Sequence, residues 1–383
     1  MKFFSFFVIP LTGRRSLVTS NFMTKNAPFT PELQKKIDTL KARRKPVHMG
    51  SLSFDSPLLL APMSSIGTAP FRLLMEDLGA GGTVSELISC HGINYKNVRT
   101  TEMLKVDPRE KNIGLQLFGE GAEAMAEAAK VAESFNPKFI DINMGCPVKK
   151  VVGTGAGSSL LKDPSALPHF FSTIKKAIKL PLTIKIRIGW DHDSINALEI
   201  IHIAKEEGIE FVAVHGRTRA QQYTGNANWE YLEHLGAKSP LDIIGNGDLH
   251  TVNFVREKMK TTNCSALMLG RGPLRNPFLF LEPYMTEEDD IFFTPDNHLE
   301  VIKKLIEYSH DYAHSDHTLL VSIRKHLIWM AAGYNNVSYF RDMIFKTPDL
   351  NETIKISEDF FNSLKDQRKR LQDHDSFMTS GHG

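Results

Sequence analysis

The sequence predicts an α/β fold, a closed (β/α)8 TIM barrel followed by a small C-terminal all-α helical domain. Eight short runs rich in apolar and β-branched residues recur between residues 57 and 272, and longer helical patterns separate them. After residue 295 the strand-like runs stop. Apolar strands that alternate with amphipathic helices are typical of a parallel sheet covered by helices, and eight such units favour closure into a barrel.

Each run has the length and composition of a buried strand. In chain order the runs are PLLLAPM (57–63), GTVSEL (82–87), NIGLQLFG (112–119), FIDINMG (139–145), LTIKIRIG (182–189), FVAVHGR (211–217), DIIGNGD (242–248) and SALMLGRG (265–272). Two intervening segments, 120–135 and 195–208, repeat apolar residues at i, i+3 and i+4, which indicates amphipathic helices. An open doubly wound sheet is the competing architecture, but it would carry GxGxxG after its first strand, and LLLAPMSSIG does not.

The segments that flank the barrel divide the chain into four parts. We expect an N-terminal extension (1–45), a barrel domain (46–290), a domain of packed helices (291–375) and a frayed tail (376–383). The first 31 residues contain no Asp or Glu and four Lys or Arg residues. Such a leader fits a disordered extension, with Met23 as an alternative start, or an organelle transit peptide. The disordered extension is favoured, because the Arg spacing of an amphipathic transit helix is weak.

Composition narrows the class of protein. The 383 residues are 42% hydrophobic and 23% charged, as in ordinary globular proteins, and no apolar run is long enough to span a bilayer. The three cysteines form no CxxC pair, which disfavours a zinc or iron–sulfur site and suits a reducing compartment. We therefore expect a monomeric cytoplasmic protein without metal or membrane, with organelle targeting as the alternative. The net charge of +2 neither demands nor excludes a nucleic acid partner.

The predicted strand ends carry a concentrated set of glycines and polar residues. In a TIM barrel these ends face the active site, and the loops after strands seven and eight commonly hold a phosphate. Here the two loops contain Gly247, Gly270 and Gly272, whose backbone N–H groups can approach an anion closely, and Arg271 adds a cation. The sequence therefore predicts a phosphorylated ligand, although each glycine by itself would equally suit a tight turn.

Two cations alternate with apolar residues on the fifth strand, TIKIRIG. This alternation points Lys185 and Arg187 into the barrel, where a lysine is rarely left unpaired. An anionic ligand such as a reduced flavin ring is favoured as the partner of Lys185, and an ion pair with Asp141 or Glu86 is the alternative.

Cys146 stands where the fourth strand ends, between Gly145 and Pro147. A buried structural thiol, a nucleophile and a general acid are the three interpretations. A nucleophile would need a nearby base, and the sequence offers no Cys–His–Asn set close by. The flanking residues indicate a shaped loop, so a protonated thiol above a carbon that takes up a proton, with a cofactor that delivers hydride, fits best. Gln116 or His215 alone would be weak evidence for a functional site, because either could be a hydrogen-bonded core residue. They become candidates only because both lie on this rim.

Taken together, these motifs resemble the tRNA-dihydrouridine synthase family, most closely its bacterial DusB-type branch. The matching segments, between about residues 50 and 375, are LLLAPM, GTVSEL, LQLFG, DINMGCPVKKV, GSSLL, TIKIRIGW, VHGRTRAQQYTG, GNGD, GRGPLRNPFLF and RKHLIWM. DINMGCP together with HGRTR is highly specific to this family, whereas a shared barrel would not be. The segments SSIGTAPFR and GSSLL depart from the family pattern, which affects the expected ligand contacts more than the reaction type.

The resemblance implies an enzyme that holds FMN noncovalently, is reduced by NADPH and converts a D-loop uridine of tRNA to 5,6-dihydrouridine. Hydride would pass from the flavin to C6, and Cys146 would protonate C5. The residues implied to bind FMN are Pro62, Met63, Ser64, Gln116, Lys185, His215, Asn246, Gly247, Asp248, Gly270 and Arg271. Those implied to contact the uridine or the rest of the tRNA are Asn143, Arg187, Lys149, Lys150, Arg324, Lys325 and His326.

Two other functions stay open at this point. An FMN-dependent oxidoreductase of a free pyrimidine would share the phosphate loops but would not need the helical domain. A non-enzymatic tRNA-binding protein would keep FMN only as a structural group. For residues 324–326 a solvated helix face is the alternative to RNA contact, and Lys149 and Lys150 are better placed for RNA.

Overall fold

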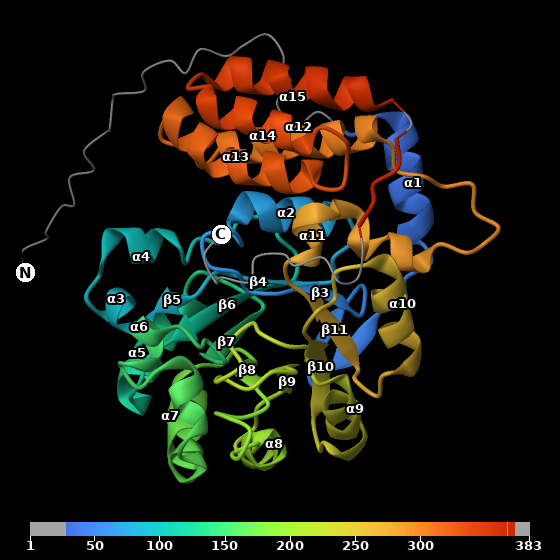
Figure 1. Ribbon diagram of the computed structural model, residues 1–383. Helices are drawn as coiled ribbons and strands as arrows, with labels where there is room; N and C mark the ends of the chain where they lie inside the picture. The colour runs from blue at the N-terminus through green and yellow to red at the C-terminus, as the bar shows by residue number, and fades with distance from the viewer. Residues whose placement is uncertain (1–27, 366, 372–383) are drawn as a thin grey trace, which may run out of the picture.

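A closed barrel of parallel strands forms the centre of the molecule (Figure 1). The structure is a computed structural model that describes residues 28–365 and 367–371. The barrel strands are β3 (Leu58–Leu60), β4 (Thr83–Val84), β5 (Ile88–Ser89), β6 (Ile113–Phe118), β7 (Phe139–Met144), β8 (Leu182–Arg187), β9 (Phe211–His215), β10 (Asp242–Asn246) and β11 (Ala266–Leu269). The ring closes because β3 pairs with both β11 and β4, and β4 also pairs with β6. The predicted TIM barrel is confirmed.

All eight predicted runs contain a barrel strand, because their apolar residues are buried on both faces of the sheet. Every residue of β7 is buried, and β6 and β8 each leave a single residue half-buried. The second strand position is split, since β4 and β5 both pair with β6 and residues 85–87 separate them. In this gap the Glu86 carboxylate accepts a hydrogen bond from the Ser65 N–H at 2.5 Å.

Helices surround the barrel (Figure 1). Those between barrel strands are α2 (Ala69–Asp77), α3 (Cys90–Asn94), α4 (Val98–Glu102), α5 (Ala122–Glu133), α6 (Lys149–Val152), η1 (Gly157–Leu161), η2 (Pro164–Ala166), α7 (Leu167–Ala177), α8 (Ala197–Glu206), α9 (Trp229–Lys238) and α10 (Val252–Thr261). After β11 follow α11 (Gly272–Arg275), η3 (Pro277–Phe280) and η4 (Glu282–Tyr284). The positions of α5 and α8 confirm the two helices predicted from apolar periodicity.

A hairpin that the sequence analysis missed packs against the barrel interior at the amino ends of β7 and β9. It consists of β1 (Val47–Met49) and β2 (Leu52–Phe54). The ring of Phe54 packs edge-on against those of Phe139 and Phe211, with ring centroids 6.1 and 6.0 Å apart. The signal was present, since the two residues between the strands begin with Gly50, whose φ is 56°, and two-residue loops with such a glycine are typical of hairpins.

Four helices form the described part of the C-terminal region, as predicted from the loss of strand-like runs. They are α12 (Pro295–His310), α13 (Asp316–Ala331), α14 (Val337–Lys346) and α15 (Leu350–Leu364). Three of them begin after side-chain caps, because the Thr294, Ser315 and Asp349 oxygens accept backbone N–H groups of the first turns of α12, α13 and α15. Within the described chain, no helix is long and apolar enough to cross a membrane.

The segment 28–45 corrects one expectation, because it is not a disordered extension. Here α1 (Pro31–Lys41) buries three apolar side chains, and Lys36 Nζ donates to the Phe292 carbonyl at 2.9 Å. Thr30 Oγ1 donates to the Glu300 carboxylate of α12 at 3.0 Å. The apolar spacing of α1 places Leu33, Ile37 and Leu40 on one face, which is buried in the main hydrophobic core, and this burial is why the stretch folds. The leader with Met23, and the tail 376–383, lie outside the described residues.

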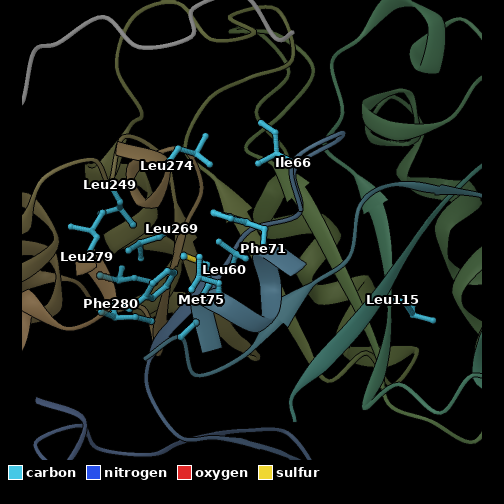
Figure 2. Packing of buried hydrophobic residues seen from close by; sticks show 14 of the residues in the cluster. Leu60, Ile66, Phe71, Met75, Leu115, Leu249, Leu269, Leu274, Leu279 and Phe280 are labelled. Atoms are coloured by element: carbon cyan, nitrogen blue, oxygen red, sulfur yellow. The ribbon is translucent and has the colours of Figure 1, made fainter. Parts of the chain in front are cut away.

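The helix α2 joins the barrel to the helical region. Its residues Phe71 and Met75 pack in one core with Leu60 of β3 and Leu269 of β11, as Figure 2 shows. On its other side α2 contacts α12, where Tyr308 Oη donates to Asp77 Oδ2 at 2.5 Å. The helical region is therefore held beside the first and last barrel strands.

Candidate active site

A cavity of about 480 Å³ opens among the carboxyl ends of the barrel strands. Its volume lies in the range of small-molecule sites. Most residues predicted to form the site line it: Pro62, Met63, Ser64, Asn143, Cys146, Lys185, Arg187, His215, Asn246, Gly247, Asp248, Gly270 and Arg271. The parallel barrel brings them together because all its strands end on one rim.

Cys146 lies on the cavity wall directly after β7 and is half-buried. Its N–H donates to Asn143 Oδ1 at 2.9 Å, and its carbonyl accepts from the N–H and hydroxyl of Ser158 at 3.1 and 2.9 Å. Ser158 comes this close because Gly157 has a φ of 59°, and a Cβ there would lie 2.9 Å from the Cys146 carbonyl oxygen. These bonds hold the loop that presents the thiol.

Burial raises the pKa of the Cys146 thiol, while the Val148 N–H and the cations Arg187 and Lys185 oppose the rise. The thiol is therefore protonated at neutral pH. This state suits a proton donor, and the nearby positive groups stabilise the thiolate that proton transfer leaves behind. A nucleophilic cysteine would instead need a lowered pKa.

A chain of hydrogen bonds runs from this loop into the barrel interior. Asn143 Nδ2 donates to Gln116 Oε1 at 2.8 Å, and Gln116 Nε2 donates to Asp141 Oδ2 at 2.6 Å. Thr183 Oγ1 completes the chain by donating to Asp141 Oδ1 at 2.6 Å. Gln116 is fully buried and is not a lining residue of the cavity. The structure thus places Gln116 behind Asn143, whereas a direct contact with a flavin ring was expected.

Lys185 enters the cavity from β8, as the alternation predicted. Its Nζ donates to Asn246 Oδ1 at 3.0 Å, and Asn246 Nδ2 donates to the Met268 carbonyl at 2.6 Å. Its hydrogen-bond partner is thus a neutral amide and neither of the carboxylates considered from sequence, Asp141 and Glu86. Burial, reinforced by a neighbouring guanidinium, lowers the pKa of Lys185 to about 8. An anionic ligand would relieve this destabilisation of the ammonium form.

Arg187 is almost completely buried and ties two loops together. Its Nε donates to the Gly145 carbonyl at 2.8 Å, and its Nη1 donates to the carbonyls of Thr218 and Gln222 at 2.8 and 2.7 Å. In the described chain, its Nη2 has no hydrogen-bond partner. The guanidinium therefore positions the Cys146 loop and keeps the two N–H groups of Nη2 for a ligand, while its contact with the base stays a prediction.

The loops after β10 and β11 form the other end of the cavity. Gly247 has a φ of 133°, and a Cβ there would lie 2.5 Å from Ala227 Cβ, so this position requires glycine. At Gly270, among the described atoms, a Cβ would meet Ala61 Cβ alone within 4 Å, at 3.8 Å. A side chain at position 270 would occupy open space of the cavity, so the glycine leaves room for ligand atoms beside its backbone.

This end of the cavity is rich in positive charge. Burial lowers the pKa of His215 well below its ordinary value, so the imidazole is neutral. Four cations lower it further: Arg187, Lys185, Arg217 and Arg271. Asp248 offsets part of this charge by pairing with Arg217 at 2.8 Å. The remaining positive field favours an anionic group such as a phosphate.

Sequence reasoning missed two contributors to the site, Tyr223 and His250, and gave no role to a third, Arg217. Tyr223 lines the cavity with its ring centroid 5.6 Å from the Arg187 Cζ and 5.5 Å from the Arg271 Cζ. His250 also lines it, and burial lowers its pKa to about 4. Arg217 holds Asp248 in place. Two of the three stand in VHGRTRAQQYTG, which marks the segment, but alternation predicts no side-chain direction once the strand has ended.

The rim residues fall into two groups. Lys149 and Lys150 of α6 are exposed beside Cys146, as an RNA contact requires. Lys325 of α13 instead donates to the Ser65 carbonyl in the loop after β3, and Arg324 donates to the Thr347 carbonyl.

His326 corrects the prediction of an RNA contact. It is 6% exposed, and its ring lies 5.1 Å from the ring of Phe71 and 5.3 Å from that of Trp329. Burial lowers its pKa to about 3, so it is a neutral packing residue between α2 and α13. The solvated helix face considered as an alternative is also wrong for this residue.

A cation-rich cavity at the strand ends of such a barrel, with a protonated thiol on its wall, is the arrangement of an enzyme active site. The family profile described as "Dihydrouridine synthase (Dus)" matches residues 59–365. This chain therefore belongs to the dihydrouridine synthase family, as its motifs predicted.

Similar proteins agree with this assignment. The "Probable tRNA-dihydrouridine synthase" of Rickettsia prowazekii is 33% identical over 84% of this chain and 100% of its own length. The "tRNA-dihydrouridine synthase B" of Pasteurella multocida is 32% identical over 85% of this chain and 99% of its own. Among solved structures, a 6-hydroxypseudooxynicotine amine oxidase from Pseudomonas geniculata N1 aligns with a TM-score of 0.51 at 12% identity. That match covers 70% of this chain and 53% of the oxidase, and it shows a shared fold.

Proposed function

We propose that this protein reduces the 5,6 double bond of a D-loop uridine in tRNA to 5,6-dihydrouridine, using FMN that NADPH reduces. Membership of the family and the names of its relatives support the reaction class. The observation that carries the proposal is the placement of Cys146, a protonated thiol on the wall of a cation-rich cavity. When bound, FMN supplies the hydride that adds to C6 of the base.

The residues of the cavity fit this cofactor. Gly247, Gly270 and Arg271 would hold the phosphate end, where open space and positive charge meet. Lys185 and Asn246 would face the ring, and the low pKa of Lys185 favours an anionic partner there. Pro62, Met63, Ser64, His215 and Asp248 line the same space and would complete the flavin site.

Cys146 would give its thiol proton to C5 as hydride arrives at C6. The S–H bond breaks, a C–H bond forms, and the sulfur keeps the electron pair as a thiolate. Lys185 and Arg187 stabilise that thiolate by their charge until solvent returns the proton. Asn143 orients the loop through its bond to the Cys146 N–H, and Arg187 Nη2 would donate to a carbonyl of the base.

The uridine must leave its stack to reach the cavity, since the thiol lies at the strand ends. Lys149 and Lys150 would contact the backbone phosphates beside it, so that affinity falls with salt. We propose that the helical region contributes further RNA contacts. Its stretch 324–326 contributes mainly by joining the region to the barrel, because those side chains bond or pack within the protein.

The test is to reduce the flavoprotein anaerobically with NADPH, add unmodified tRNA and follow flavin reoxidation. We expect rapid reoxidation by tRNA and little by uridine or orotate. Cys146→Ala should bind tRNA but lose turnover, while Cys264→Ala, which alters a half-buried cysteine outside the cavity, should keep it.

The other results separate the alternatives. Rapid reoxidation by a free pyrimidine alone would indicate a small-molecule oxidoreductase. Binding of tRNA without reoxidation would indicate a non-enzymatic RNA-binding protein. Full dihydrouridine formation by Cys146→Ala would remove the general-acid assignment.

A further inference from the structure

Two exposed apolar side chains stand on the barrel rim outside the cavity. Tyr95 exposes 83% of its surface and Val98 exposes 77%. They lie at the junction of α3 and α4, directly after β5, and so at the same end of the barrel as the cavity (Figure 1). An exposed aromatic ring beside a second exposed apolar side chain offers a surface on which a partner can pack.

The junction that carries Tyr95 is well ordered by hydrogen bonds. The Tyr95 N–H donates to the His91 carbonyl at 2.9 Å, and the Asn97 N–H donates to the Gly92 carbonyl at 2.9 Å. Asn97 Oδ1 then caps α4 by accepting from the Thr100 N–H at 3.1 Å. Tyr95 is therefore displayed on a pre-organised support, which reduces the entropy lost when a partner covers the ring.

A series of contacts connects Tyr95 to the loop of the catalytic thiol. Its ring stacks beside that of His91, with centroids 6.5 Å apart and planes at 23°. His91 Nε2 lies 2.9 Å from Glu120 Oε1. Glu120 in turn borders the Cys146 loop, because a Cβ at Gly155 would lie 3.5 Å from Glu120 Cβ.

Exposed cations stand beside the ring in the chain. Lys96 and Arg99 neighbour Tyr95 and Val98, and Lys149 and Lys150 stand on α6 at the same end of the barrel; all four are exposed and have no ion-pair partner among the described residues. The nearby acids are already paired, Glu102 with Lys105 at 2.7 Å and Glu120 with His91. An aromatic ring among uncompensated cations matches single-stranded nucleic acid, whose bases stack while its phosphates need positive charge.

We propose that Tyr95 stacks on an unpaired base of the tRNA, other than the uridine that is reduced, and that Lys96 and Arg99 contact the adjoining phosphates. This inference rests on the proposed function and names a contact that seats the substrate. A protein partner fits less well, because the cores of protein interfaces are depleted in lysine and this surface alternates two apolar side chains with cations.

The test measures tRNA affinity without turnover, using the oxidised FMN-loaded protein and unmodified tRNA. Tyr95→Ala should weaken binding by roughly five- to 100-fold, the range found for loss of one stacked base. Tyr95→Phe keeps the ring and should bind as the wild type does. Tyr231→Ala serves as the control for loss of a tyrosine ring elsewhere, because the half-buried Tyr231 also stacks beside a histidine, His234, but on α9.

The salt dependence tests the cations separately. The double variant Lys96→Ala/Arg99→Ala should reduce the slope of log affinity against log salt by about 2, while Tyr95→Ala should leave the slope unchanged. FMN content and thermal unfolding, measured for every variant, show that the cavity and fold are intact.

Three results would overturn the inference. Affinity of Tyr95→Ala within twofold of the wild type would show that no base stacks there. Equal weakening in Tyr95→Phe would assign the effect to the hydroxyl. A dimer in size-exclusion chromatography that Tyr95→Ala dissociates would assign the surface to a second copy of the chain. Failure of the wild-type protein to bind tRNA would instead refute the proposed function, and the two failures are thereby distinguished.

Discussion

Replacing Gln116 with methionine removes the central link between the Cys146 loop and the barrel interior. In the wild type, Gln116 accepts from Asn143 and donates to Asp141, at 2.8 and 2.6 Å. Asn143 in turn accepts the Cys146 N–H at 2.9 Å. Methionine has a similar volume but cannot form either bond, so the substitution leaves two buried polar groups without their partner.

Each unsatisfied buried group costs about 1–3 kcal/mol, so unfolding should require about 2–6 kcal/mol less free energy in Gln116→Met. Loss of the restraint on Asn143 should also slow the step that depends on Cys146. If about 1.4–2.8 kcal/mol of that cost appears in the transition state, the rate falls about ten- to 100-fold. The pKa of Asp141 should rise further, because the hydrogen bond from Gln116 opposes its elevation.

The assay combines urea unfolding with single-turnover reoxidation by tRNA. Leu115→Met is the matched control: Leu115 is also fully buried on β6 (Figure 2), and this exchange should cost less than about 1.5 kcal/mol and leave the rate unchanged. An unchanged flavin absorption spectrum is expected, because Gln116 lies behind the cavity wall. A wild-type rate and stability in Gln116→Met would refute the restraint, and a shifted spectrum would restore the direct flavin contact.

Three further predictions concern charged and titrating groups. Lys325→Met removes the hydrogen bond to the Ser65 carbonyl in the loop that lines the cavity, so FMN affinity should fall a few fold in a fluorescence titration. Lys325→Arg can still donate to this carbonyl and should retain the affinity. Equal affinity in both variants would contradict a positioning role of Lys325. Burial raises the pKa of Asp141 from 3.8 to about 6, so the folded state binds this proton more tightly than the unfolded chain does. The contribution of Asp141 to the free energy of unfolding is therefore complete below pH 3.8 and is lost as the pH rises through 6, a change of about 3 kcal/mol. Urea titrations at several pH values should show this change in the wild type and not in Asp141→Asn. Since burial raises the pKa of the Cys146 thiol, its alkylation should become rapid only at a pH above that of an ordinary thiol, and a thiol pKa below the ordinary value, measured from the pH dependence of alkylation, would exclude this thiol as the acid.

The barrel was predictable because each buried strand requires a short apolar run, and such runs can be seen within one segment of the sequence. A run such as FIDINM, buried at every position, can be recognised without knowing its neighbours. The cavity was predictable for a related reason, since parallel strands in a closed barrel all end at one rim. Residues from strands far apart in the chain, such as Asn143 and Gly270, could therefore be assigned to one site.

Strand register decided what those patterns left open. The pairing of β6 with β7 sets Gln116 opposite Asp141, and that of β7 with β8 sets Asn143 opposite Lys185. Periodicity shows that these polar residues point inward, but it does not show which of them bond to one another. For this reason Gln116 was expected at the ligand and is found behind Asn143.

The packing of α13 on its neighbours determined whether the side chains of residues 324–326 are exposed. From sequence, three polar residues in a row on a helix read as a surface, and a family resemblance suggested RNA. In the structure, α13 lies against α2 and the loop after β3, so His326 packs on Phe71 and Lys325 bonds to Ser65.

By itself, the sequence determined the alternation of strands and helices, the rim on which chemistry occurs and the thiol at its centre, since each depends on spacing within one segment. Only the tertiary structure decided the hydrogen-bond partners of the buried polar groups and the surfaces that stay exposed, such as Tyr95. These features depend on contacts between segments distant in the chain, and no local periodicity encodes such contacts.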